Sequence, residues 1–481
     1  MGLLKIEYQN IANTDAIESE QVVSTREDVV TRYHDVFSEE VGHLEGDLHL
    51  ELDPQVTPVQ LPVTKIPLAL QEHLQVELQE LEERGIIARV DVPADWMSGM
   101  VVERKKNDKL RVCLDPRPLN KALKRAHYLM PAVDDVLPAL ANARVFSVCD
   151  LQNGFWHISL DEESNYLTTF ATPFRRYRWL RMPFGISPAP EIFQSRLEVA
   201  LSGLDGVKAI VDDLLVYGEG ETMEQAVEQH NARLLALLQQ CRKKGIRLQL
   251  EKFWFQVQEV KYCGYIFTTG GLKPDQEKIR AITSMAHPET KQEMRRYIGM
   301  VNYLAQFLPR LSDLAEPLTT LMKDGVMFIW NERTQKAFQL IQEALVAGPV
   351  LRFFNKSLDT VLQCDASSIG LGAALLQDGQ PVAFASRVLS ESERNYAQIE
   401  KELLAIVFGF TRFRQYLYGR KLTVDSDHKP LQWLYGKPLN LVPKRLQRMF
   451  LYLQDFEYSI RYRRGVEMHL ADALSRAPIS R

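Results

Sequence analysis

Three aspartates near the ends of apolar segments are the side chains whose type and spacing most directly suggest chemistry. Asp150 ends the run ARVFSVCD, while Asp212 and Asp213 stand between VKAIV and LLVY. An isolated pair of aspartates is most simply a turn, but adjacent anions between two strands repel each other unless a cation neutralises them. Three carboxylates on neighbouring strand ends can hold two divalent ions about 3.5–4 Å apart, as phosphoryl and nucleotidyl transfer require. The pattern therefore favours a two-metal site.

A second group of acids follows in the last quarter of the chain, where each would be an ordinary surface charge by itself. The acids that fall at strand or helix ends are Asp365, Glu402, Asp427 and Asp472. Two of these assignments have alternatives. Asp425 points to the same face of a strand as Asp427, so periodicity does not choose between them. Glu400 and Glu402 flank the apolar stripe of their helix symmetrically, so geometry does not choose there either.

The elements that would position these acids are strands and helices in alternation. Around the first group, the apolar patterns predict a strand over 143–150 and two short strands over 207–217, hinged on the two aspartates. The other elements expected before the boundary at Gly348-Pro349 are helices at 68–84 and 223–244, strands over 100–114, a hairpin over 260–267 closed by Gly270-Gly271, and helices over 274–345. Those expected after it are a strand into Asp365, a long helix over 396–417, a strand over 421–427 and a short helix at 470–475.

Length and composition indicate an ordinary globular protein of several domains. The chain has 481 residues, 46% of them hydrophobic and 25% charged, which favours two to four domains. Its five cysteines form no CxxC pair, which argues against a zinc site or a disulfide framework. No apolar run approaches the roughly 18 residues of a membrane span, so no membrane partner is expected. Residues 1–60 hold 3 Lys+Arg against 13 Asp+Glu, and 410–481 hold 14 against 6. A basic C-terminal part is compatible with polyanion binding.

Five ordered motifs resemble those of reverse transcriptases. Val211-Asp212-Asp213 resembles the xxDD box, and Asp150 with Phe155 resembles the aspartate motif that precedes it. The other three are Arg111–Asp115 with Arg117–Asn120 in the fingers, RMPFGISPAPEIFQ (181–194) beneath the templating base and nucleotide, and Tyr262–Tyr265 as the primer grip. In order and spacing, these motifs are similar to Pol of gypsy-type LTR retrotransposons, the metavirus family, from about residue 30 to the C-terminus.

The resemblance implies a fold of two modules. It would be an α+β polymerase right hand, with fingers, palm and helical thumb, followed by an α/β RNase H-like domain. The boundaries expected from it are an acidic, only partly ordered N-terminal extension (1–60), fingers and palm (61–272), thumb (273–330), linker (331–355) and RNase H domain (356–481).

Metal ligands are implied in both modules. In the polymerase, Asp150 and Asp212 would be the main ligands and Asp213 would support them. The acids of the second group resemble the D-E-D-D set of RNase H, which cuts RNA paired with DNA. The DHKPL pattern favours Asp427, and ELLAI favours Glu402. The implied cofactor is Mg²⁺, two ions per active site, with Mn²⁺ able to substitute.

Nucleotide and primer contacts are implied by the same resemblance. Arg111, with Lys105 or Lys106, would neutralise the nucleotide triphosphate. Phe155 would be a steric gate that leaves no room for a 2′-hydroxyl. The remaining assignments are Phe184 in the nucleotide site and Cys263, Gly264 and Tyr265 in the primer grip.

The partners implied are an RNA template, a DNA primer, the RNA/DNA hybrid and deoxynucleoside triphosphates. The thumb cations that could contact phosphates, or could equally be solvated helix charges, are Lys291, Arg295, Arg296 and Arg310. Tyr297, Tyr303 and Phe307 are expected in the thumb core. Only about 30 residues separate the thumb from the RNase H domain, which leaves no room for a connection domain. The resemblance therefore suggests an asymmetric homodimer on substrate, acting in the cytoplasm within virus-like particles.

Two other functions fit parts of this pattern. One is a nuclease whose polymerase part has decayed to a hybrid-binding platform, and the other is a non-catalytic nucleic-acid-binding protein. The presence of both acid groups argues against each of them. Since neither a DTG or DSG triad nor a His/Cys zinc set occurs, the chain is expected to be the middle of a polyprotein.

Overall fold

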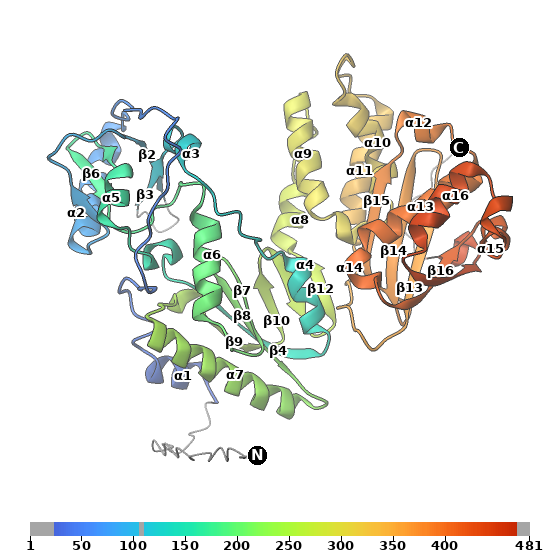
Figure 1. Ribbon diagram of the computed structural model, residues 1–481, viewed down its shortest axis with the longest axis horizontal. Coiled ribbons are helices and arrows are strands. Elements are labelled where there is room, and N and C mark those ends of the chain that lie inside the picture. The colour runs from blue at the N-terminus through green and yellow to red at the C-terminus, as the bar shows by residue number, and fades with distance from the viewer. Residues whose placement is uncertain (1–23, 105–109, 469–481) are drawn as a thin grey trace, which may run out of the picture.

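The computed structural model describes residues 24–104 and 110–468. Four regions follow one another along its longest axis, and we call them fingers, palm, thumb and RNase H-like module (Figure 1). Lys105, Lys106, Asp472 and the helix expected at 470–475 lie outside the described residues. Among the described residues, no helix is long and apolar enough to cross a membrane.

A four-stranded antiparallel sheet forms the palm. Its order is β7 (Val207–Ile210), β8 (Asp213–Glu219), β4 (Ala143–Asp150) and β9 (Trp254–Val257). β4 is buried almost throughout, so its apolar run was a reliable strand signal. The helix α7 (Met223–Lys244) packs on β8 and β4; it begins at a Thr222 capping box and ends at Gly245, whose φ of 70° suits glycine. The remaining palm elements are α4 (Val133–Val136), η1 (Leu137–Leu140), η2 (Gly154–His157), α6 (Ala189–Ala200) and η3 (Leu250–Lys252).

The fingers are built from small sheets and one amphipathic helix. Helix α2 (Leu68–Glu83) buries Leu74, Leu78 and Leu81, as its periodicity predicted. β2 (Gly99–Arg104) pairs with β3 (Leu110–Asp115), and β6 (Arg176–Trp179) lies between β1 (Ile87–Arg89) and β5 (Phe170–Ala171). The short helices here are α3 (Leu119–Ala122) and α5 (Glu162–Leu167).

The described part of the acidic N-terminal segment, residues 24–60, is folded. The fingers and the palm share one hydrophobic core, which we call the first core. Helix α1 (Arg26–Arg32) and the chain after it place Val29, Tyr33 and Leu44 in it. The acidic character is partly balanced by ion pairs, such as the one in which Arg242 Nε donates to Asp35 Oδ2 at 2.7 Å. Val29, Tyr33 and Val36 recur at helical spacing, but an apolar stripe within a strongly acidic segment does not tell which surface will cover it, so the sequence did not reveal their burial.

The hairpin after the palm has a different closing turn from the expected one. β10 (Glu259–Tyr262) pairs with β11 (Tyr265–Thr268), and β11 pairs with β12 (Gly271–Pro274). The turn between β10 and β11 is therefore Cys263-Gly264, whereas Gly270 lies in the next turn and Gly271 begins β12. Cys263 has φ of 46° and Gly264 has φ of 81°. Positive φ at both residues is the signature of a type I′ hairpin turn.

The thumb consists of helices, and the expected linker is part of it. Its elements are α8 (Gln276–Thr283), α9 (Lys291–Tyr303), η4 (Ala305–Phe307), α10 (Leu311–Leu321) and α11 (Glu332–Val346). Helix α11 occupies most of the segment expected as a linker, and it buries Phe338, Ile341 and Leu345 in the second core. The linker assignment was wrong, because these apolar residues recur at helical spacing and pack in the second core.

The last module is a five-stranded mixed sheet covered by helices. Its order is β15 (Gln380–Val388), β14 (Gly370–Gln377), β13 (Thr360–Ala366), β16 (Lys421–Ser426) and β17 (Glu457–Tyr462), with β13, β16 and β17 parallel. Helix α13 (Gln398–Arg412) packs on β13 and β14, and the long helix expected there breaks at Phe413 before α14 (Arg414–Leu417). The other helices are α12 (Glu391–Arg394), α15 (Lys429–Tyr435), η5 (Leu439–Leu441), α16 (Lys444–Leu453) and η6 (Gly465–Glu467).

We expect Leu44→Ala to lower the free energy of unfolding by about 2–5 kcal/mol, because it leaves a cavity in the first core. Glu45→Ala, a change of an exposed neighbour, is the matched control and should have little effect. Urea denaturation of the two variants measures the difference. Equal stabilities would mean that the N-terminal segment does not pack on the palm as described.

Two candidate carboxylate sites

Strand pairing brings the first group of aspartates together. Asp150, the last residue of β4, lies opposite Asp213, the first residue of β8. The backbone of Leu151 donates to the carbonyl oxygen of Asp212 at 2.9 Å, which ties the turn to the end of β4. The hinge differs slightly from the expected one, since the turn is made by Val211 and Asp212 and Asp213 already belongs to β8. All three residues therefore lie at one end of the palm sheet.

The Asp212 carboxylate is buried without a hydrogen bond to compensate it. Its Oδ1 atom has no hydrogen-bond partner among the described residues. Burial, together with the charges of Asp150 and Asp213, raises the pKa of Asp212 to about 6. A Cβ atom on Gly154 would lie 2.0 Å from this Oδ1, so only glycine leaves room for the carboxylate. An unpaired anionic oxygen beside two further carboxylates is the donor set that a divalent cation fits.

A lysine that the sequence did not single out also belongs to this site. Lys252 extends from η3, and its Nζ lies 2.9 Å from Asp150 Oδ2. Its charge offsets part of the repulsion among the three acids. Lys252 is about a hundred residues from Asp150 in the chain and follows no motif that the sequence analysis used, so only the folded structure reveals the contact.

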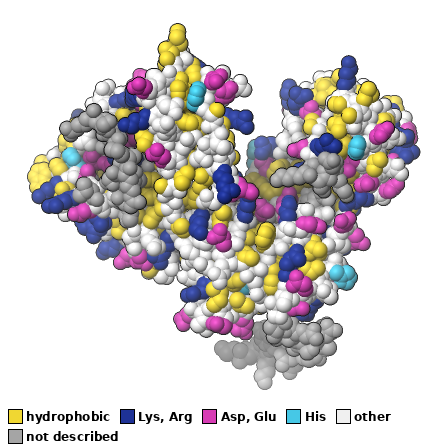
Figure 2. Space-filling model, turned by 180° about the vertical axis from the view of Figure 1, so that it is seen from behind, with side chains coloured by type: hydrophobic (Ala, Val, Ile, Leu, Met, Phe, Trp, Pro, Cys, Tyr) yellow, Lys and Arg dark blue, Asp and Glu magenta, His cyan; other side chains and the backbone are white. Residues whose placement is uncertain are grey.

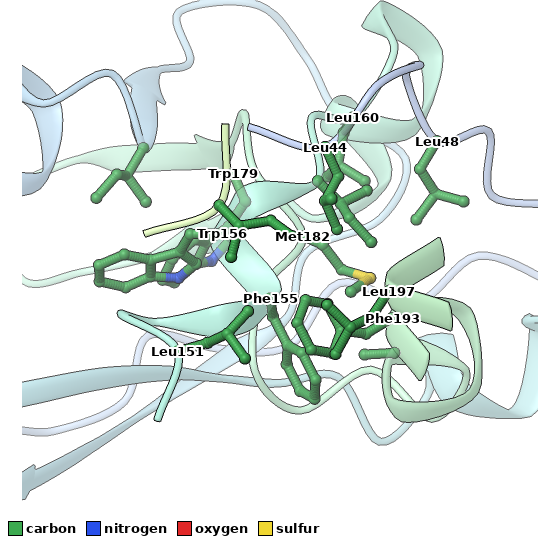
Figure 3. Packing of buried hydrophobic residues seen from close by; sticks show 14 of the residues in the cluster. Leu44, Leu48, Leu151, Phe155, Trp156, Leu160, Trp179, Met182, Phe193 and Leu197 are labelled. Atoms are coloured by element: carbon green, nitrogen blue, oxygen red, sulfur yellow. The ribbon is translucent and has the colours of Figure 1, made fainter. Parts of the chain in front are cut away.

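The expected nucleotide residues line the same end of the palm. Phe155 lies on η2 and is almost fully buried; its ring centre is 4.9 Å from that of Phe184 and 5.5 Å from that of Phe193. Figure 3 shows Phe155 and Phe193 side by side within this core. The Arg111 guanidinium lies over the Phe184 ring, 4.0 Å from its centre. Aromatic packing thus fixes Phe155, while Arg111 is held by a cation–π contact.

The expected primer grip is braced by the thumb. The Tyr303 hydroxyl donates to the carbonyl oxygen of Cys263 at 3.1 Å, and its ring stacks on Tyr265 at 5.2 Å. Tyr303 was expected in the thumb core together with Tyr297 and Phe307. Those two are buried, but Tyr303 is 41% exposed, so its placement in the core was wrong. It is the last residue of α9, where helical periodicity no longer decides burial.

Three acids of the second group also converge. Ligand atoms of Asp365 on β13, Glu402 on α13 and Asp427 after β16 all lie within 4.8 Å of one another. Burial, followed by the charge of Asp365, raises the pKa of Glu402 to about 8. Gln398 Nε2 donates to Glu402 Oε1 at 2.6 Å, whereas Oε2 is buried and has no hydrogen-bond partner among the described residues. This donor set fits divalent cations as the first one does.

The two alternatives that the sequence left open are held away from this cluster. Asp425 is fully buried and accepts hydrogen bonds from Arg461 Nε at 2.8 Å and from Arg463 Nη1 at 3.3 Å. Glu400 is bound by Arg445 at 2.9 Å. Strand periodicity failed to separate Asp425 from Asp427 because β16 ends at Ser426, so Asp427 no longer follows the alternation.

Arg310, one of the four expected phosphate-binding cations, contacts the second acid cluster instead. Its Nη1 lies 3.1 Å from Asp365 Oδ2, and its Nη2 donates to Asp313 Oδ2 at 2.7 Å. Arg310 adopts φ of 53° just before α10, which directs its side chain toward the RNase H-like module. Of the other three, Lys291 donates to the carbonyl oxygen of Lys323, while Arg295 and Arg296 are exposed on α9.

Two known protein families match separate parts of the chain. Residues 103–267 match the family described as reverse transcriptase (RNA-dependent DNA polymerase). Residues 330–424 match the RNase H-like domain found in reverse transcriptase. The second match includes α11, in agreement with the folded state of that segment.

Curated relatives are similar over most of the chain. The Pol polyproteins of transposons 297 and 412 of Drosophila melanogaster are 34% and 32% identical over 425 and 475 residues, which is 86% and 95% of the chain. The Tf2-3 polyprotein of Schizosaccharomyces pombe is 31% identical over 440 residues, or 89% of the chain. The chain spans only 39%, 37% and 32% of these three relatives.

Solved structures share the fold. A foamy viral protease-reverse transcriptase in complex with double-stranded DNA superimposes with a TM-score of 0.82 at 22% identity, over 92% of this chain and 79% of that one. The same kind of protein in complex with an RNA/DNA hybrid gives 0.76 at 21% identity, over 96% and 63%. These likenesses bear out the expected fold class.

The raised pKa of Glu402 predicts a pH-dependent stability in metal-free buffer. Between 4.5 and about 8 the folded chain keeps a proton that the unfolded chain has lost, so stability falls as pH rises through this window. Glu402→Gln removes this loss of stability at higher pH, because a glutamine side chain does not titrate. In EDTA, its melting temperature should rise relative to wild type from pH 5 to pH 8. Glu400→Gln, which breaks the pair with Arg445, is the control and should gain nothing; equal profiles for both variants would contradict the burial of Glu402.

Proposed function

Because the chain belongs to the reverse transcriptase and RNase H lineage of the Pol polyproteins of gypsy-type LTR retrotransposons, we propose that it copies RNA and DNA templates into DNA and cleaves the RNA of RNA/DNA hybrids. It is then an RNA-directed DNA polymerase with ribonuclease H activity. The observation that carries this proposal is the pair of carboxylate clusters, one in each module. Each cluster contains a buried carboxylate oxygen without a hydrogen-bond partner among the described residues.

In the polymerase site, Asp150, Asp212 and Asp213 hold the divalent ions. These ions, when bound, lower the pKa of the attacking 3′-hydroxyl and stabilise the leaving pyrophosphate. We propose Mg²⁺, two ions per site, with Mn²⁺ as a substitute, because oxygen-only ligand sets suit these cations. Lys252 then loses its role as the counter-charge of Asp150 and becomes available to the phosphates.

The deoxynucleotide is selected and held by the residues around η2. Arg111 neutralises the triphosphate from its place over the Phe184 ring. The Phe155 ring closes the space beneath the sugar, and its contacts with Phe184 and Phe193 keep it from moving aside for a 2′-hydroxyl. Lys105 and Lys106 stay predictions for the same triphosphate, since they lie outside the described residues.

The nucleic acid lies in the hollow between fingers and thumb. Figure 2 shows the molecule hollowed between these two lobes on the face seen from behind. Arg295 and Arg296 on α9 are exposed and suit the phosphates of a template–primer duplex. The Cys263–Tyr265 turn, braced by Tyr303, positions the primer end. The hybrid then continues to the RNase H-like module.

In the second site, Asp365, Glu402 and Asp427 hold the ions that activate water for cleavage of the RNA strand. Asp472, the fourth member by resemblance, stays a prediction. With ions bound, Asp365 would offer them a carboxylate of which one oxygen contacts Arg310 in this structure. Glu402 would hold an ion as the carboxylate, without the proton that burial favours.

We also propose that the enzyme works as an asymmetric homodimer on its substrate, in the cytoplasm and within virus-like particles. Between Val346, the end of α11, and Thr360, the start of β13, the chain has no room for a further domain. A second copy can supply the missing support for the hybrid. Sedimentation on an RNA/DNA hybrid should give the mass of two chains; a single chain at saturating hybrid would rule out the dimer.

Primer extension and RNA degradation on one labelled hybrid test the two activities together. Asp212→Asn should lower extension by more than about 10²-fold and leave hybrid cleavage intact, because it disrupts one cluster only. Asp365→Asn should do the reverse. A wild-type protein that makes no DNA with Mg²⁺ or Mn²⁺ but still cleaves the hybrid would instead indicate a nuclease with a decayed polymerase module.

A further inference from the structure

The turn that carries Asp212 has a backbone conformation that its sequence does not favour. Val211 has φ of 51°, in the left-handed region that β-branched residues rarely adopt. Such a conformation persists only where the surrounding structure holds it in place. The position of Asp212 follows directly from this turn, so whatever stabilises Val211 also sets the geometry of the first carboxylate site.

The Gln194 side chain makes the contacts that hold this turn. Gln194 lies on α6 and is fully buried. Its Oε1 accepts from the Val211 backbone N–H at 2.7 Å, and its Nε2 donates to the Ala209 carbonyl oxygen at 3.0 Å. Nε2 also donates to Glu198 Oε1 at 2.8 Å. The amide oxygen therefore faces a donor and the amide nitrogen faces two acceptors, which fixes the orientation of the amide group.

Phe193, the residue before Gln194, packs near Gly154 and the Asp212 carboxylate. The Phe193 ring lies 3.0 Å from the place of a Cβ on Gly154, the glycine against which Asp212 Oδ1 packs. The same ring contacts Phe155. Two consecutive residues of one helix therefore define both the turn and the floor beneath the carboxylate.

We propose that Gln194 is a positioning residue for nucleotide addition, which it serves by holding the Val211 turn so that Asp212 faces Asp150. This inference rests on the proposed polymerase function. Among the described residues, the Gln194 side chain forms hydrogen bonds with Val211, Ala209 and Glu198 and with none of the three aspartates. Its effect on the reaction is transmitted through the backbone between Val211 and Asp212.

Gln194→Met tests the proposal at nearly constant side-chain volume. It leaves the Val211 N–H and the Ala209 carbonyl buried without partners, so the turn relaxes toward an ordinary conformation. We expect kcat for incorporation of a single nucleotide to fall by about 10²-fold, as a displacement of roughly 1 Å costs. The KM for the nucleotide and the Kd for the primer–template should change little. Hybrid cleavage by the same protein should be unaffected.

Gln377→Met is the matched control for a loss of stability alone. Gln377 is also fully buried and also bonds backbone atoms: its Oε1 accepts from Asn355 N, and its Nε2 donates to Asn355 O, both at 2.8 Å. It lies on β14 of the RNase H-like module, and its partner Asn355 contacts Asn142, which precedes β4 at the end opposite Asp150. The two variants should lose similar melting temperature, but only Gln194→Met should lose kcat for extension.

A double exchange, Gln194→Glu with Glu198→Gln, provides the rescue. Because residue 194 is fully buried, a carboxyl there keeps its proton. One of its oxygens can then accept from the Val211 N–H, its O–H can donate to the Ala209 carbonyl oxygen, and an amide at 198 can donate to it. The rate of primer extension by this variant should stay within about tenfold of wild type. If Gln194→Met does not fold, this rate is the measurement that tests the proposal. The proposal is overturned if Gln194→Met extends as well as Gln377→Met, or if the double exchange loses about 10²-fold. A wild-type chain without extension would refute the proposed function itself.

Discussion

Mutual repulsion among clustered, partly buried carboxylates is the constraint to which the rest of this structure answers. Removing one anion from water is costly, and placing two more beside it is tolerable only next to cations. The chain supplies one such cation to each cluster, Lys252 for Asp150 and Arg310 for Asp365. Yet in each cluster one buried oxygen, Asp212 Oδ1 or Glu402 Oε2, is left without a hydrogen bond in the described structure. A protein that needed these acids only for stability would have satisfied those oxygens.

The two sites reach this arrangement from different sheets. In the palm, antiparallel pairing puts the end of β4 opposite the start of β8, so Asp150 and Asp213 meet through register. In the RNase H-like module, β13 and β16 are parallel, so the ends of both strands lie at the same edge of the sheet. The third ligand comes there from α13, which packs on that sheet. In both sites, acids within a strand ladder (Asp150, Asp213 and Asp365) are joined by one that lies just outside a strand (Asp212 or Asp427), so acids of neighbouring strands gather at one edge of the sheet.

Local pattern predicted much of this protein, and long-range contacts account for what it missed. The palm strands, α7 and the two acid groups carry signals within a few residues: an apolar run, a cap or an acid at a strand end. The roles of Lys252, Gln194 and Arg310 depend on partners that are distant in the chain, and no spacing encodes them. The helix α11 was expected from its apolar spacing, but its packing in the second core was not, since an apolar stripe does not tell which surface will cover it. The same reason applies to the buried residues of 24–60.

Arg310 links the two modules at the point where their electrostatics matter most. It precedes α10 of the thumb, and its guanidinium is shared between Asp313 of that helix and Asp365 of the other module. The second core runs through the same contact region, because thumb residues such as Leu318 share it with Phe384 of β15. A cation bound by Asp365 would compete with the guanidinium for the same carboxylate, while Asp313 would keep Arg310 near its present place. The charge of the second site would then act on the start of a thumb helix through this one side chain.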